Sequence, residues 1–108
     1  MAASQPPIVR KGDLRHDLSA LAAEAPPDAT LVIFHTAVLS YLALQDQRDS
    51  FSESVRQIAD HWISNEWACV FPRLAPECQT TDMSRFLIML DGKAMAWSDP
   101  HGRLLTCA

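Results

Sequence analysis

The sequence predicts an α/β fold whose open sheet ends in an antiparallel β-hairpin. Residues 31–34, Leu-Val-Ile-Phe, form a run of four apolar residues, which is typical of a strand covered on both faces. Apolar residues at helical spacing occur on both sides of that run. Near the C-terminus, Asp91-Gly92 separates two apolar runs, and this dipeptide favours the tight turn of a hairpin.

The N-terminal elements are a short strand and a helix. Residues 8–11 form a possible strand, which Gly12-Asp13 closes. Helical spacing of Leu and Ala residues then predicts a helix over residues 14–25, with Asp13 as its N-cap and a Pro-Pro-Asp stop after it. We expect residues 1–7 to be a disordered segment and residues 8–108 to be a single α/β domain.

The central elements are a strand and two helices. The strand covers residues 30–35, and a helix is expected from Thr36 or Ala37 to residue 45. Ser50 and Glu53 have the spacing of a capping box, which predicts that a second helix begins there. Its apolar stripe consists of Phe51, Val55, Ile58, Ala59 and Trp62.

In the C-terminal third, the sequence predicts strands and a long loop rather than helices. Residues 67–71, Trp-Ala-Cys-Val-Phe, predict a strand, and residues 72–84 predict a long polar loop that is either mobile or part of the rim of a site. The hairpin strands are residues 86–90 and 93–97. A turn over residues 99–103 leads to a last extended segment at residues 104–106.

Composition excludes several classes of function. A chain of 108 residues can bury a core without disulfides or metals, and its net charge of -4 argues against a nucleic-acid surface. The three cysteines are odd in number and have no CxxC spacing, which indicates reduced thiols. No segment has the pattern of a secretion signal or the apolar length of a membrane span. We therefore expect a soluble, cytoplasmic protein that binds neither nucleic acid nor membranes.

The predicted strand at residues 30–35 indicates where a site would lie. His35 and Thr36 fall at its carboxyl end, where open α/β sheets bind ligands. His35 is a candidate general base or substrate ligand, or else a neutral histidine that ties the strand to the next helix. Asn65 and Glu66 are candidates for ligand contact, Glu66 in a catalytic role, or else they cap and solvate a chain end.

Three further residues are candidates for substrate binding, each with an ordinary structural alternative. Tyr41 is the first, and its alternative is a half-buried aromatic residue. Asp99 and His101 flank a proline turn, and Asp-Pro and His-Gly are common turn sequences. No HxH, HxxxH or GxSxG pattern is present, so neither a metal site nor a serine nucleophile is predicted.

The order of elements resembles the second half of the doubly wound sheet in S-adenosylmethionine-dependent methyltransferases. Gly12-Asp13-Leu14, residues 31–42, residues 62–66, Leu90-Asp91-Gly92 and residues 99–102 together resemble a family of uncharacterised bacterial proteins with a methyltransferase-like fold. This resemblance implies that Gly12 and Asp13 approach the adenine side of the cofactor. It also implies that His35, Thr36, Asn65 and Glu66 face the acceptor substrate.

The chain departs from that family in one respect. It has three glycines and no GxG arrangement, and it resembles the C-terminal portion without the glycine-rich loop. We therefore expect weak or no binding of S-adenosylmethionine by this chain, although a full-length relative would bind it. Two functions follow: a methyltransferase-like fragment, or a non-catalytic α/β module. The module would associate with itself, as a homodimer or larger species, or with a complementary N-terminal half.

Overall fold

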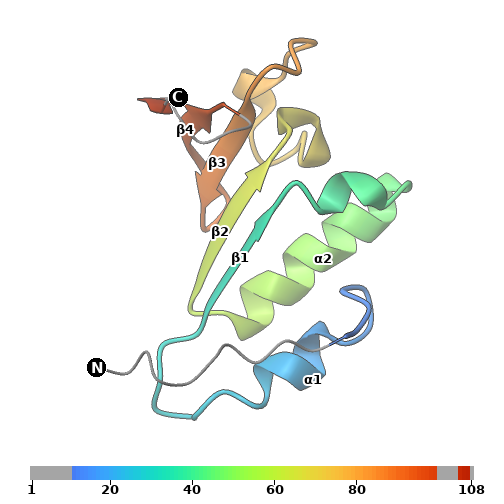
Figure 1. Cartoon of the computed structure of the whole chain (residues 1–108), viewed down its shortest axis with the longest axis vertical. Helices are drawn as coiled ribbons and strands as arrows, with labels where there is room; N and C mark the ends of the chain where they lie inside the picture. The colour runs from blue at the N-terminus through green and yellow to red at the C-terminus, as the bar shows by residue number, and fades with distance from the viewer. Residues whose placement is uncertain (1–10, 100–104, 108) are drawn as a thin grey trace.

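The computed structural model describes residues 11–99 and 105–107, and in this part of the chain a five-stranded mixed sheet is the central element. The strands follow the order β1-β2-β3-β4-β5. Strands β1 (Val32–Thr36) and β2 (His61–Glu66) are parallel, and helix α2 (Gln45–Ile58) crosses between them. Helix α1 (Leu18–Ala22) precedes β1 (Figure 1).

The remaining strands are antiparallel. They are β3 (Phe86–Leu90), β4 (Lys93–Ser98) and β5 (Leu105–Cys107). Asp91 and Gly92 have φ angles of 52° and 84°, the two positive values that a type I′ hairpin turn requires. The predicted hairpin is therefore confirmed, as is a mixed α/β fold whose sheet ends in antiparallel strands.

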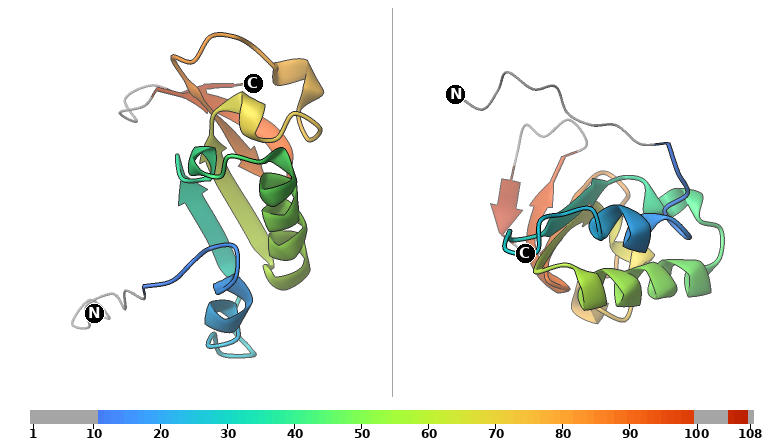
Figure 2. Two further views of the ribbon diagram at one scale, coloured as in Figure 1. Left: turned by 90° about the vertical axis from the view of Figure 1, so that its right-hand side faces the viewer. Right: turned by 90° about the horizontal axis from the view of Figure 1, so that it is seen from below.

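The core lies between the helices and one face of the sheet. Phe51 and Val55 of α2 pack in one cluster with Trp62 of β2 and with Leu87 and Met89 of β3. Leu18 of α1 and the preceding Leu14 pack against the same cluster, so both described helices lie on the same side of the sheet (Figure 2).

No described helix covers the opposite face of the sheet, and its side chains are exposed over β1 and β2, whereas Phe86 and Ser98 on the same face are buried. In β2 the buried side chains of Trp62, Ser64 and Glu66 alternate with the outward ones. Strand register carries the alternation across the sheet, so Phe34, Ile63 and Leu90 lie side by side on the outer face. We call the part of this outer surface that is not buried the bare face; its large apolar residues are Val32, Phe34, Ile63, Ile88, Leu90 and Leu105.

Two predicted helices differ from the structure at their starts. The helix expected from Thr36 or Ala37 to residue 45 is reduced to a single 3-10 turn, η2 (Leu39–Tyr41), because Ala37 adopts a left-handed φ of 53° that a helix does not allow. The capping box is also wrong. Helix α2 already begins at Gln45, so Ser50 and Glu53 lie within it.

The end of α2 and the strand after it were also predicted wrongly. The helix ends at Ile58 rather than continuing to Trp62, and residues 61–66 form β2. The strand expected at residues 67–71 is instead the 3-10 turn η3 (Ala68–Val70), which buries Ala68 and Val70 in the core. The loop that follows contains the turn η4 (Pro76–Cys78) and the fully buried Ala75, so part of it belongs to the core.

The first helix is shorter than predicted. Asp13 does not cap it: the carbonyl of Asp13 accepts hydrogen bonds from the N–H groups of His16 and Asp17, which close a turn, and Asp17 precedes α1. Residues 1–7, most of the strand expected at residues 8–11 and most of the turn at residues 99–103 lie outside the described residues.

Candidate functional site

The carboxyl ends of β1 and β2 bring His35 and Glu66 together. The Nδ1 atom of His35 lies 2.6 Å from Oε2 of Glu66, and the two side chains are 8% and 2% exposed. These are the two residues that the sequence offered as catalytic. Both point into the core, toward α2, rather than into solvent.

Trp62 determines the protonation of the His35 ring. Its indole Nε1–H donates to Nε2 of His35 at 2.9 Å. Because an indole only donates, Nε2 carries no hydrogen, and Nδ1–H donates to Glu66. The imidazole is therefore neutral, with both nitrogens engaged. Phe51 and Trp62 enclose it, with ring centroids 5.2 Å and 6.0 Å away.

The backbone after β1 supplies the other partners of Glu66. The N–H of Val38 donates to Oε2 at 3.1 Å, and the N–H of Leu39 donates to Oε1 at 3.3 Å. The left-handed Ala37 turns the chain so that these consecutive N–H groups point at one carboxylate. Such backbone concavities bind anions. At the end of β1, where an open sheet would take an anionic ligand, the anion is the chain's own Glu66.

One buried hydroxyl departs from this pattern of satisfied groups. Ser64 is 1% exposed, and its Oγ has no hydrogen-bond partner within the described part of the chain. It pairs with His35 in the β1–β2 register, so it lies on the core face of the sheet. A buried hydroxyl with no route to solvent is poorly placed to act as a nucleophile.

A groove beside η2 gathers three other predicted residues. Gly12 and Asp13 line one side of this hollow of about 580 Å³, and Tyr41, Leu44 and Val38 line the other. Tyr41 is 85% exposed and Leu44 is 61% exposed. The groove therefore combines the residues expected to contact cofactor with one of those expected to contact substrate.

Asp13 is not a free carboxylate in this groove. Arg15 donates to it through its backbone N–H at 2.9 Å, Nε at 3.0 Å and Nη2 at 2.7 Å. These bonds hold the pKa of Asp13 far below its usual range and raise the pKa of Arg15.

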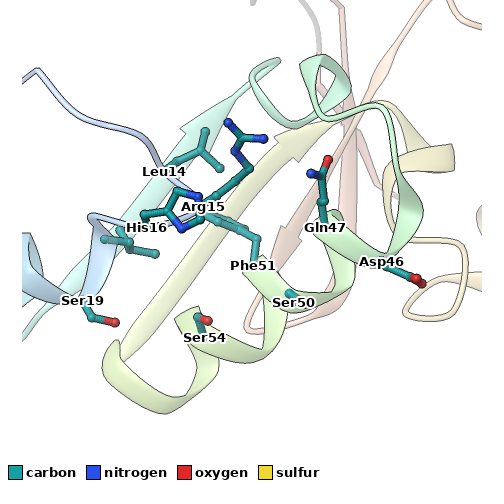
Figure 3. Close-up of a pocket in the computed structure, with 10 residues that line it drawn as sticks. Leu14, Arg15, His16, Ser19, Asp46, Gln47, Ser50, Phe51 and Ser54 are labelled. Atoms are coloured by element: carbon teal, nitrogen blue, oxygen red, sulfur yellow. The ribbon is translucent and has the colours of Figure 1, made fainter.

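A second hollow of about 280 Å³, between the α1 region and α2, adjoins the groove at Arg15 and Gln47 (Figure 3).

The other predicted site residues are dispersed. Thr36 is exposed at the end of β1. Asn65 lies on the opposite side of the sheet from Glu66, and its Oδ1 accepts a hydrogen bond from Ser98 Oγ at 3.0 Å. Asp99 follows β4 directly, and His101 lies outside the described residues.

Sequence reasoning did not identify Trp62, Ala37 or the apolar row of the bare face as important. Trp62 was assigned to a helical stripe, four residues after Ile58, although it belongs to β2. Recognising residues 61–66 as a strand parallel to β1 would have placed Trp62 and Glu66 on the face that carries His35. A left-handed alanine has no sequence signal of its own.

Other kinds of site find little support in the described part of the chain. Within residues 11–99 and 105–107, no three His, Cys, Asp or Glu side chains are grouped so as to hold a metal ion. Burial raises the pKa of the Cys78 thiol, which disfavours the nucleophilic thiolate. None of the described helices has the length and apolar character that a bilayer crossing requires.

Comparison with known proteins gives one result. The model of a family described as an uncharacterised protein conserved in bacteria (DUF2332) matches residues 1–106. No curated protein matches, and no solved structure matches.

Proposed function

The chain belongs to this bacterial family, and we propose that it is a non-catalytic α/β module that binds another polypeptide through the bare face of its sheet. The observation that carries the proposal is the apolar row Phe34, Ile63 and Leu90, which crosses three neighbouring strands. The exposed fractions of these residues are 75%, 38% and 39%. Contiguous exposed apolar surfaces of this kind are typical of binding sites.

The parallel arrangement of β1 and β2 supports the proposal. Parallel strands are normally covered on both faces, and here α2 covers one face only. Strand β1 is also an edge strand of the described sheet, with no charged residue or proline between Val32 and Thr36 to discourage pairing. Both features favour completion of the sheet by further polypeptide.

The His35–Glu66 pair supports the non-catalytic part of the proposal. Both imidazole nitrogens are engaged, and backbone N–H groups and His35 surround the carboxylate. A general base needs a lone pair within reach of substrate, and this pair offers none without rearrangement. Its hydrogen bonds instead favour a structural role, in which the pair holds β1, β2 and the start of η2 together.

Binding of the dye 8-anilinonaphthalene-1-sulfonate tests the proposal, because the dye fluoresces on exposed apolar surface. The triple variant F34T/I63T/L90T makes the row polar, and threonine is a β-branched residue that favours strands. We expect the dilute wild-type chain to bind the dye and the variant to lose most of that signal while its unfolding remains cooperative. Equal signals from the two folded proteins would contradict the proposal. A matched control, Tyr41→Thr, removes an exposed aromatic residue from the groove and should leave the signal nearly unchanged.

A second candidate function is a methyltransferase-like fragment with a doubly wound parent fold. The groove favours it, since Gly12, Asp13 and Tyr41 line one hollow. The engagement of Asp13 by Arg15 and the lack of a glycine-rich loop both predict weak affinity. Calorimetric titration with S-adenosylmethionine tests this candidate. A dissociation constant in the low micromolar range or tighter, lost on Asp13→Ala, would favour the enzyme fragment over the binding module.

A further inference from the structure

We infer that the open edge of β1 is the docking site of residues 8–10 of the same chain, which pair with it as a further parallel strand. Those residues lie outside the described ranges, and the described chain begins directly after them, at Lys11. Strand β1 carries neither a charged residue nor a proline to block its edge. The pairing uses this edge and leaves the bare face of the sheet free.

The positions of α1 and α2 determine on which side of β1 a preceding strand lies. Crossovers between parallel strands are right-handed in about 98% of cases, so two crossovers on one face of a sheet advance in the same direction across it. Helix α2 leads from β1 to β2, and α1, which precedes β1, lies on the same side of the sheet (Figure 2). A strand before α1 therefore belongs at the edge of β1 that faces away from β2.

The start of the described chain lies near the place where such a strand must end. A strand parallel to β1 ends beside the carboxyl end of β1, and Gly12 lines one hollow with Val38, which follows that end. A parallel neighbour also needs a connection of a dozen or more residues, usually with a helix. Residues 12–31, which contain α1, provide that connection.

The sequence of the segment suits an edge strand. Ile8 and Val9 are β-branched, and at about 3.3 Å per residue the three residues span about 10 Å, against about 17 Å for β1. A Pro-Pro pair precedes them and an Arg-Lys pair follows, and prolines and cations are residues that keep an outermost strand from pairing further. The segment therefore covers the unprotected edge of β1 and carries its own protection against other chains.

Backbone alternation in β1 identifies the amides that report this pairing. The N–H of Ala37 donates to a carbonyl of β2 at 3.0 Å, so the N–H groups of Ile33 and His35, at the same phase, also face β2. The N–H groups of Phe34 and Thr36 face the open edge; we call them the edge amides, and those of Ile33 and His35 the inner amides. Without a neighbouring strand, the edge amides exchange rapidly with solvent.

Amide hydrogen exchange followed by NMR on the 108-residue chain tests the inference. The variant I8P/V9P removes two consecutive N–H groups, one of which must point toward β1 in the proposed pairing. The matched control S4P/Q5P places two prolines upstream of the segment instead. We expect the edge amides to exchange at least tenfold faster in I8P/V9P than in the wild type and the control, with the inner amides nearly unchanged.

Equal exchange of the edge amides in the wild type and in I8P/V9P would overturn the inference. Protection that appears only as the protein concentration rises would also overturn it, because it would indicate pairing with a second chain. If I8P/V9P does not fold, nuclear Overhauser effects between backbone protons of residues 8–10 and of β1 in the wild type decide the question. Their presence supports the pairing, and their absence overturns it.

Discussion

Replacement of His35 by alanine removes the centre of the buried polar network and leaves two groups without a partner. The indole N–H of Trp62 loses its acceptor, and the carboxylate of Glu66 loses the donor 2.6 Å away. A buried donor without a partner costs about 1–3 kcal/mol, and a hydrogen bond to a charged group contributes about 1.5–3 kcal/mol. We therefore expect His35→Ala to lower the free energy of unfolding by about 3–5 kcal/mol.

Urea unfolding followed by tryptophan fluorescence measures this loss as a lower midpoint at an unchanged slope. His61→Ala is the matched control: the side chain of His61 is 56% exposed and, among the described residues, bonds to Asp91, so its loss should cost less than about 1 kcal/mol. A His35→Ala midpoint within the range of that control would refute the structural role of the network. It would return His35 to consideration as a site residue with a solvent-accessible lone pair.

Three further predictions follow from the same region and the hairpin turn. Ala37→Gly should raise the free energy of unfolding by up to about 1 kcal/mol in urea titrations, because glycine adopts the left-handed φ of 53° without strain; a loss of stability would contradict that backbone geometry. Glu66→Ala should lower the melting temperature. Sodium formate should partly restore that temperature, because formate fits the N–H groups of Val38 and Leu39, whereas sodium chloride at the same concentration should not. The backbone N–H of Trp62 and, to a smaller extent, the His61 ring lower the pKa of Asp91. Its contribution to the free energy of unfolding is therefore complete above about pH 4 and is lost as the pH falls below that value. Asp91→Asn should reduce this acid-induced loss of stability in pH-dependent unfolding, and an unchanged loss would exclude the effect.

Local signals predicted the elements that local chemistry determines. The Asp91-Gly92 turn was correct because the positive φ angles of its two residues suffice to define it. Strand β1 was correct to within two residues because its apolar run ends at a polar pair. Strand β2 was missed because its pairing partners, β1 and β3, are distant in sequence, and nothing in residues 61–66 indicates that pairing.

The candidate site shows the same division between local and long-range information. His35 and Glu66 could be selected as polar residues near chain ends, but their contact joins residues 31 positions apart. Trp62 continued the spacing of a helix, and tertiary pairing placed it in a strand instead. The bare face becomes visible only once the register of β1, β2 and β3 is known, since Phe34 and Leu90 are distant in sequence.

Methyl NMR with a soluble paramagnetic agent tests the central claim most directly, because the two faces of the sheet carry isoleucines that can be compared. Ile63 lies on the bare face and is 38% exposed, whereas Ile33 packs against the core under the helices. In a dilute sample, we expect strong broadening of the Ile63 methyl signal and little broadening of the Ile33 signal. Equal protection of the two methyl groups at every concentration would contradict an uncovered, binding-competent face.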